Sequence, residues 1–370
     1  MRITFVLPSS DLSGGIRVAA IYAQRLKQRG HEVLVVYPPP RQPTLKEKVK
    51  SLVKGRGWPG RRVAGPSHLD NTDVPCQVLE RYRPVVDADV LDADVVVATW
   101  WETAEWVAKL SPSKGAKAYF IQHDETVWFL DDPTWVARVG ATWRLPLHKI
   151  TIARWLVELS PERAGGEAID LVPNSVDSQQ FHAEPRGKQA VATVGVMYAT
   201  NHFKGTDISL AAMRLAKKVL PDLRFVAFGT QPFGATMPLP VECEYRQRPQ
   251  QDEIRDIYAK CDAWLFGSRC EGFGLPILEA MACRTPVIGT PAGAAPELLA
   301  GGGGILVKPE DPQSMADAIV QVARMPETQW QAMSDAAYAT ARRYTWDDAT
   351  VLFEKALEHA VQRAGAGKTV

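Results

Sequence analysis

The sequence predicts an α/β protein made of two doubly wound, Rossmann-like domains. Its 370 residues exceed the length at which a single hydrophobic core is usual. Short apolar runs alternate with amphipathic helical patterns from the first residues onward, which is typical of parallel sheets. The same alternation begins again near Val191, after a polar stretch at 177–188 that we interpret as a linker. We therefore expect an N-terminal domain over residues 1–180 and a C-terminal domain over residues 188–345.

The composition is that of an ordinary globular protein. Hydrophobic residues make up 46% of the chain and charged residues 23%, and the net charge of +1 gives no overall attraction to nucleic acid. The five cysteines show no paired CxxC spacing, which suits a reducing cytoplasm and argues against a zinc site. A strand pattern follows Met1 at once, and no apolar run approaches about 18 residues. We therefore expect neither a signal peptide nor a membrane-spanning helix.

The chain opens with a strand, a loop that contains two glycines, and a helix. The strand covers residues 2–7, the helix 16–29, and a second strand 31–37. Ligands bind at the carboxyl ends of parallel strands, so Gly14 and Gly15 lie where a ligand is expected. The G-x-G-x-x-G spacing is absent, which excludes a dinucleotide site of that kind. A plain tight turn is the other interpretation of the glycine pair.

Residues 41–62 depart from this compact pattern. Four apolar residues fall on one face of a helix, and a tryptophan follows: Leu45, Val49, Leu52, Val53 and Trp58. The charges around them are Lys46, Lys48, Lys50, Lys54, Arg56, Arg61 and Arg62 against Glu47 alone. Such a segment suits the surface of an anionic membrane, or an acidic or lipid-linked acceptor, with residues 44–62 as the contact. A solvated helix whose apolar stripe packs on the domain is the alternative.

The later strands of the first half are expected at residues 93–98, 117–122, 149–153 and 169–177, with an edge segment between residues 81 and 94. His123 follows one of these strands directly, beside Asp124, which is where open α/β sheets place their chemistry. A core histidine bonded to a backbone carbonyl is the other interpretation. Eight of the 11 tryptophans precede residue 156, and either stacking on acceptor sugars or core packing accounts for them.

A strand, a glycine-containing loop and a helix carry the strongest signal in the second half. The strand covers residues 262–267, and the helix begins near Pro276. Gly272 and Gly274 keep the loop free of Cβ atoms, so its N–H groups and the positive end of the helix suit a diphosphate. Glu271 stands where it can face a neutral polyol, and Glu279 where a ribose would lie. A ligand-free strand-loop-helix of any α/β domain is the alternative.

The remaining elements of the second half follow the same βα pattern. Strands are expected at residues 191–196, 223–229 and 305–308, and helices at 206–219, 251–261, 311–325, 327–343 and 347–363.

The string from Glu271 to Ala282 resembles the E-x7-E signature of retaining nucleotide-sugar glycosyltransferases of family 4, also called glycosyl transferases group 1. Residues 283–290 and 293–297 resemble the family's next strand and its glycine-rich turn. Residues 173–177 resemble its sequence at the domain junction, with Ser175 in place of glycine. The resemblance extends over residues 191–346 by sequence and over the first half by layout.

This resemblance implies the GT-B fold, in which two Rossmann-like domains face a central cleft. The N-terminal domain would bind the acceptor, and a C-terminal helix at 346–363 would cross back to complete it. The catalytic residues implied are His123, Glu271 and Lys204, with Lys204 on the diphosphate oxygens. The donor-binding residues implied are Gly14, Gly15, Lys204, Arg248, Gly272, Phe273, Gly274, Leu275 and Glu279. The family's arginine is replaced by Val196, and His202, Arg269 or a residue of the N-terminal domain is expected to substitute for it.

The expected activity is that of a retaining, metal-independent transferase. It would move a sugar from a nucleoside-diphosphate sugar to a saccharide or lipid-linked acceptor in bacterial-type polysaccharide biosynthesis. We expect no metal and no cofactor, because no Asp-x-Asp string follows a strand and Lys204 with the loop amides would neutralise the diphosphate. A GT-B-fold sugar-nucleotide epimerase and a catalytically silent sugar-nucleotide-binding protein remain alternatives. The expected location is the cytoplasm, with a peripheral contact on the inner face of the membrane if residues 44–62 bind lipid.

Overall fold

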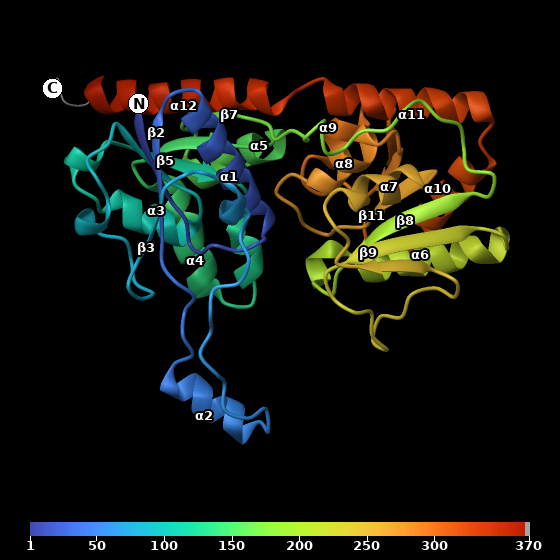
Figure 1. The fold of residues 1–370 in the computed structure, drawn as a ribbon, viewed down its shortest axis with the longest axis horizontal. Coiled ribbons are helices and arrows are strands. Elements are labelled where there is room, and N and C mark those ends of the chain that lie inside the picture. Colours follow the sequence, from blue (N-terminus) through green and yellow to red (C-terminus); the bar gives the residue numbers. More distant parts are fainter. Residues whose placement is uncertain (367–370) are drawn as a thin grey trace. The chain divides into compact units, whose positions relative to one another are not determined.

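The computed structural model describes residues 1–366 and divides into two α/β units (Figure 1). Unit 1 comprises residues 1–152, 156–172 and the described chain from Thr350 onward, and unit 2 comprises residues 153–155 and 173–349. Each unit has its own sheet of parallel strands, so the predicted pair of doubly wound domains is confirmed. Of the helices in residues 1–366, none is long and apolar enough to cross a membrane.

Unit 1 contains a seven-stranded sheet in the order β3-β2-β1-β4-β5-β6-β7. The strands are β1 (Arg2–Val6), β2 (Glu32–Tyr37), β3 (Cys76–Val78), β4 (Val95–Ala98), β5 (Ala116–Ile121), β6 (His148–Thr151) and β7 (Ile169–Leu171). The helices are α1 (Gly14–Gln28), α2 (Leu45–Val53), α3 (Trp101–Ala108), α4 (Pro133–Ala141), α5 (Arg154–Ala164) and the greater part of α12 (Trp346–Ala366). β4 is buried along its whole length, as expected of a parallel strand covered on both faces.

Two expectations for this sheet were wrong. The edge strand is β3, not a segment of residues 81–94, where the Arg83 guanidinium binds the Asp89 carboxylate at 2.8 Å and stabilises a turn instead. The strand expected at residues 169–177 ends as β7 at Leu171. Pro173 has no N–H to donate, so the sheet ladder stops close to this residue.

The C-terminal helix α12 completes the core of unit 1. Phe353 stacks on Tyr22 of α1 with a centroid distance of 4.3 Å, and it meets the edge of Phe120 of β5 at 5.0 Å. Glu354 receives hydrogen bonds from Arg29 at 2.6 Å and lies 2.7 Å from the His31 ring nitrogen. The expected return of the terminal helix to the N-terminal domain is therefore observed from Thr350 onward.

Unit 2 contains a six-stranded parallel sheet in the order β10-β9-β8-β11-β12-β13. The strands are β8 (Thr193–Tyr198), β9 (Arg224–Gly229), β10 (Glu244–Gln247), β11 (Ala263–Phe266), β12 (Val287–Gly289) and β13 (Gly304–Leu306). The helices are α6 (Thr206–Val219), α7 (Glu253–Ala259), α8 (Leu275–Ala282), α9 (Ala295–Leu299), α10 (Pro312–Arg324) and α11 (Glu327–Arg342). Apolar residues of β8, β9, α6 and α10 form a continuous core beneath the sheet centre.

Candidate functional site

The carboxyl ends of β8 and β11 form the topological switch point of unit 2. These strands are neighbours at the centre of the sheet. From β8 the sheet extends through β9 to β10 on one side, and from β11 through β12 to β13 on the other. The loops that follow the two strands therefore diverge, and ligands of open α/β sheets bind at such points.

Lys204 and Glu271 meet at this switch point. Lys204 ends the short 3-10 turn after β8, and Glu271 follows β11. The Lys204 Nζ lies 2.7 Å from the Glu271 Oε1, to which the Ser268 hydroxyl also donates at 2.9 Å. The lysine side chain is 31% exposed and the glutamate side chain 12%, so the ion pair is accessible from solvent. Ser268 is a third polar group here, and no sequence pattern predicted a role for it.

Two glycines let the loops of Lys204 and Glu271 approach each other. Gly205 has φ of 55°, and a Cβ built on it would lie 1.8 Å from the Gly267 carbonyl oxygen. A Cβ on Gly267 would lie 2.4 Å from the Ser209 hydroxyl. Any side chain at either position would force the loops apart, so the Lys204–Glu271 contact depends on both glycines.

The predicted phosphate loop, Gly272–Leu275, lies at the start of α8. Gly274 precedes the helix with φ of 98°, which favours glycine. The Phe273 carbonyl accepts the Ala294 N–H at 2.9 Å, so the turn after β12 fixes the loop. Among the described residues no side chain caps this end of α8. Its first N–H groups and the positive end of its dipole are thus suited to an anion.

Glu279 lies in α8, one turn beyond Leu275. Its side chain belongs to a residue that is only 7% exposed, and its Oε2 accepts the Tyr258 hydroxyl at 3.0 Å. Tyr258 comes from α7 and is fully buried. This hydrogen bond holds the carboxylate in a fixed orientation. Beyond its place in a predicted helix, no sequence pattern pointed to Tyr258.

Of the residues expected to replace the arginine of the resembled family, His202 lies in the 3-10 turn after β8 and Arg269 in the loop after β11. Val196 is buried within β8. Arg269 already pairs with Asp207 at 2.8 Å and with Glu310 at 2.7 Å, so its charge is largely matched by two carboxylates. Arg248 follows β10, is exposed, and donates through Nε to the Thr230 carbonyl at 2.9 Å. Arg248 thus lies at the same edge of the sheet as Lys204, beyond the end of β9.

The two glycines of unit 1 open α1. Gly14 is the first helical residue, and nothing lies within 4 Å of a Cβ built on it. A Cβ on Gly15 would contact the Gln122 amide at 3.5 Å, and Gln122 donates to the Gly15 carbonyl at 3.2 Å. Gln122 immediately follows β5, so the loop after β1 and the end of β5 meet here.

His123, the residue after Gln122, is nearly buried at 9% exposure. Its Nδ1 lies 3.0 Å from the Asp124 carbonyl oxygen, and its ring packs against Trp128 with a centroid distance of 4.5 Å. The backbone contact is the one that the core interpretation requires, and the ring stays at the carboxyl edge of the sheet. Its contact with a sugar hydroxyl remains a prediction.

Glu125 is a buried acid for which no function was predicted from the sequence. It is 2% exposed, and its Oε2 accepts the Tyr119 hydroxyl and the Trp101 N–H, each at 3.0 Å. Burial raises the pKa of Glu125 to about 8. The string His-Asp-Glu after a strand was the available signal, but burial could not be inferred from it. The carboxyl bonds the first N–H of α3 and is a structural group.

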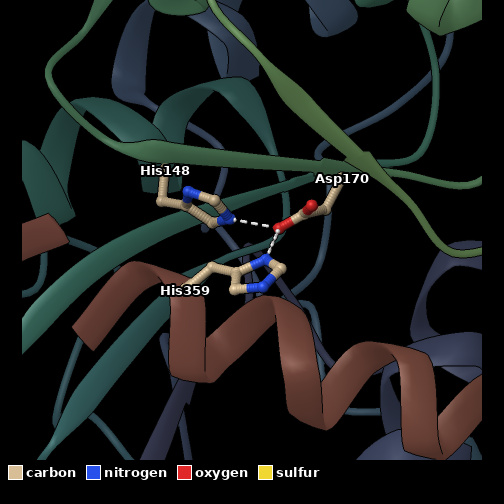
Figure 2. Close-up of side chains that lie close together, drawn as sticks. All are labelled: His148, Asp170 and His359. Atoms are coloured by element: carbon tan, nitrogen blue, oxygen red, sulfur yellow. Dashed lines mark hydrogen bonds and ion pairs between the residues drawn. The ribbon is translucent and has the colours of Figure 1, made fainter. Parts of the chain in front are cut away.

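A cluster with metal-ligand chemistry lies elsewhere in unit 1, beside α12 (Figure 2). Within residues 1–366, the ligand atoms of His148, Asp170 and His359 all lie within 4.8 Å of one another. Asp170 Oδ2 is 2.7 Å from the His148 Nε2 and 3.0 Å from the His359 Nδ1. Arg363 lies 3.0 Å from the His148 Nδ1 and can only donate, so Nδ1 is the acceptor and Nε2 carries the proton.

That proton makes the His148 Nε2 a donor to Asp170 and not a metal ligand. Burial lowers the pKa of His148, against the opposing effect of Asp170. Burial alone would raise the pKa of Asp170, but the hydrogen bonds from His359 and His148 outweigh it and lower that pKa. The cluster therefore ties α12 to β6 and β7, and its residues lie outside the predicted donor site.

Comparisons with known proteins agree with this architecture. Residues 188–325 match the family model described as "Glycosyl transferases group 1". A D-inositol 3-phosphate glycosyltransferase of Segniliparus rotundus is 30% identical over 207 residues, which are 50% of this chain and 45% of the relative. A lipopolysaccharide core biosynthesis mannosyltransferase of Rhizobium meliloti is 33% identical over 142 residues, 34% of this chain and 39% of the relative. The matched segments span less than half the length of these two relatives.

The fold is shared over the whole chain with HepE of Anabaena, solved in complex with UDP and glucose. The TM-score is 0.73 and the identity 18%, over 97% of this chain and 100% of that one. The predicted GT-B fold is thereby confirmed. The segment 188–325, which carries Lys204, Glu271 and Glu279, is similar to the group 1 glycosyltransferases, as its motifs indicated.

Proposed function

We propose that the protein is a retaining glycosyltransferase that uses a nucleoside-diphosphate sugar. The observation that carries this proposal is the Lys204–Glu271 pair at the switch point of unit 2, where the N–H groups of α8 also begin. An ammonium and a helix terminus suit the diphosphate of a donor, and a carboxylate suits sugar hydroxyls. HepE, which has the same fold, was solved with UDP and glucose, and this supports a donor of that class.

The roles of the side chains follow from their chemistry. Lys204 has three N–H donors, so it can keep Glu271 and still bind a phosphate oxygen. Glu271 would hold hydroxyls of the donor sugar, Glu279 the ribose diol, and His123 a further sugar hydroxyl. Arg248 and the backbone near it would lie beside the nucleotide. Gly14 and Gly15 would lie under the donor. The ion pair between Lys204 and Glu271 would hold both side chains in position before a ligand binds.

In the proposed reaction the bond between the sugar C1 and the diphosphate oxygen breaks as the acceptor oxygen bonds to C1 on the same face. The acceptor hydroxyl gives its proton to the departing phosphate oxygen. Lys204 and the N–H groups at the start of α8 stabilise the negative charge that develops on the leaving group. These groups supply positive charge from the chain itself, which is why we propose that the transfer needs no metal.

The acceptor we propose is a saccharide or lipid-linked saccharide of glycan biosynthesis. The similarity to a lipopolysaccharide core mannosyltransferase supports this class. We place the reaction in the cytoplasm, because the five cysteines are free thiols in the structure. The replaced arginine favours a silent binding protein, whereas the Glu271 and Glu279 pair argues against it, and the arginine does not bear on an epimerase.

A donor screen tests the proposal. Thermal unfolding is measured with UDP-, GDP- and dTDP-sugars, because a ligand that binds only the folded state raises the melting temperature. The stabilising donor is then incubated with and without saccharide acceptors in the presence of a metal chelator. Transfer with retained anomeric configuration supports the proposal. Release of a free sugar without acceptor would identify an epimerase, binding without turnover a silent protein, and the absence of any stabilising donor would reject all three.

A further inference from the structure

The segment 41–62 forms an arm that extends from unit 1, here named the basic arm. Its base is closed by the side-chain amide of Gln42, which donates to the Arg62 carbonyl at 2.8 Å and accepts the Arg62 N–H at 3.0 Å. Figure 1 shows α2 at the end of two extended chain segments, away from the other elements of unit 1. No residue of α2 is buried. The alternative in which its apolar stripe packs on the domain is therefore wrong.

The helix of the basic arm is stabilised locally. Thr44 and Glu47 form a capping box: the Glu47 N–H donates to the Thr44 hydroxyl at 3.2 Å and the Thr44 N–H to the Glu47 carboxylate at 2.7 Å. A nine-residue helix is marginal in water by itself. The capping box adds local stability, so the helix can present its apolar stripe before a partner is met.

The apolar stripe of the basic arm, including Trp58, is exposed to solvent. Exposed fractions are 71% for Leu45, 48% for Val49, 56% for Leu52, 82% for Val53 and 56% for Trp58. Transfer of such side chains from water to an apolar medium is favourable. A contiguous exposed stripe of this kind marks an interaction surface and not a core.

The charge of the basic arm decides what that surface meets. Residues 41–62 hold eight of the chain's 43 Lys and Arg but one of its 42 Asp and Glu. The chain as a whole has a net charge of +1, so the positive charge is concentrated on this projection. The Lys48 ammonium lies 5.6 Å from the Trp58 ring centroid, which places a cation beside an indole as at membrane interfaces.

Only a partner that is both anionic and apolar satisfies the two features together. A nucleic acid offers phosphates but no apolar medium for leucine and valine. A second basic arm would bring like charges together. A bilayer with anionic lipids offers headgroup phosphates to the lysines and acyl chains to the stripe.

We propose that the basic arm is a membrane anchor, with α2 and Trp58 in the interface of a bilayer that contains anionic lipids. This goes beyond the proposed function, because the contact needs neither donor nor transfer. It would hold unit 1 at the surface where a lipid-linked acceptor is found.

The test is co-sedimentation of the full chain with vesicles, without any sugar nucleotide. Vesicles of phosphatidylcholine that contain phosphatidylglycerol are compared with pure phosphatidylcholine at low and high salt. A stripe variant carries Leu45→Gln, Val49→Gln and Leu52→Gln, and a charge variant carries Lys46→Gln, Lys50→Gln and Lys54→Gln. Glutamine keeps helix propensity, and all of these positions lie outside the core, so folding is checked by an unchanged melting temperature. A matched control replaces the exposed Lys109, Lys218 and Lys355 by glutamine.

The wild type and the control are expected to bind the anionic vesicles and to release them as salt rises. The charge variant should bind about 100-fold more weakly, at about 1 kcal/mol for each lysine near the surface. The stripe variant should lose at least about tenfold with its charges intact. Equal binding to both kinds of vesicle, or wild-type binding by the stripe variant, would overturn the proposal. Binding to polyglutamate would also overturn it if the stripe variant lost that binding as strongly as it lost vesicle binding. That result would indicate an acidic protein partner.

Discussion

Glu271 of unit 2 and Glu125 of unit 1 occupy similar places in similar sheets, yet their surroundings give them different chemistry. Each follows the end of an interior strand, β11 or β5. Glu271 has the Lys204 ammonium at 2.7 Å and an accessible side chain. Glu125 is buried, and its Oε2 accepts bonds from a tyrosine hydroxyl and a backbone N–H, both neutral donors. A carboxyl group at the end of an interior strand is therefore a candidate site residue. Its hydrogen-bond and charge partners decide whether it serves as a charge or as a neutral acid.

Glu271→Gln is the sharpest test of this contrast. The substitution keeps the shape of the side chain but removes the charge that faces Lys204. We expect kcat/KM for transfer to fall about 10²–10³-fold, because a group that orients the reacting sugar is lost. The melting temperature should change little, since a partly exposed ion pair contributes about 0–1 kcal/mol.

The matched control is Glu244→Gln, which removes an exposed ion pair with Arg246 elsewhere in unit 2. Activity and stability should both be retained there. A similar loss of activity in the two variants, or full activity of Glu271→Gln, would contradict the role of Glu271.

Glu125→Gln should have the opposite profile, with transfer retained and the pH dependence of stability changed. The pKa of Glu125 is raised to about 8 from its ordinary value of 4.5, so the folded state holds a proton that the unfolded state releases. Its contribution to stability is complete below pH 4.5 and is lost as pH rises through about 8. At about 1.4 kcal/mol for each pH unit, the free energy of unfolding should fall by on the order of 5 kcal/mol over this range.

Urea unfolding at several pH values measures that change. In Glu125→Gln the side-chain carbonyl can still accept from Tyr119 and Trp101, and no proton is released, so the alkaline decline should be reduced. Glu105→Gln, which removes an exposed pair with Arg138 in the same unit, should keep the decline of the wild type. Identical pH profiles for wild type and Glu125→Gln would mean that the acid is not neutral in the folded protein.

The sequence predicted those features that depend on local patterns. The helix expected at residues 206–219 is observed as Thr206–Val219, because its apolar spacing and the preceding glycine mark both face and start. The start of α8 was predicted within one residue for the same reason. The family resemblance implied that Lys204 and Glu271 serve the same donor site, but their ion pair was not predicted, since 67 residues separate them.

Features that depend on packing between distant segments were not predictable. The Tyr258 contact with Glu279, the complete burial of Glu125 and the position of β3 each require knowledge of which elements lie side by side. The pattern of the basic arm was visible in sequence, but its separation from the domain was not. An amphipathic stripe indicates that a helix packs against a partner surface. It does not indicate whether that surface belongs to the same protein or to another molecule.

The two units also differ in the backbone at their glycine-containing helix starts, Gly274 before α8 and Gly14 in α1. The expected effects of substitution on stability are smaller here. Gly274 has φ of 98°, and a Cβ there would lie 3.0 Å from the Phe266 ring, so Gly274→Ala should cost about 1–2 kcal/mol of stability. Gly14 has no atom within 4 Å of a Cβ, so Gly14→Ala should be neutral or should stabilise α1 by up to about 1 kcal/mol. Urea midpoints test this difference, and equal destabilisation would contradict it. A stable Gly14→Ala variant with weakened donor binding would show that the glycine serves the ligand, whereas unchanged binding would mean that it has only a structural role at the start of α1.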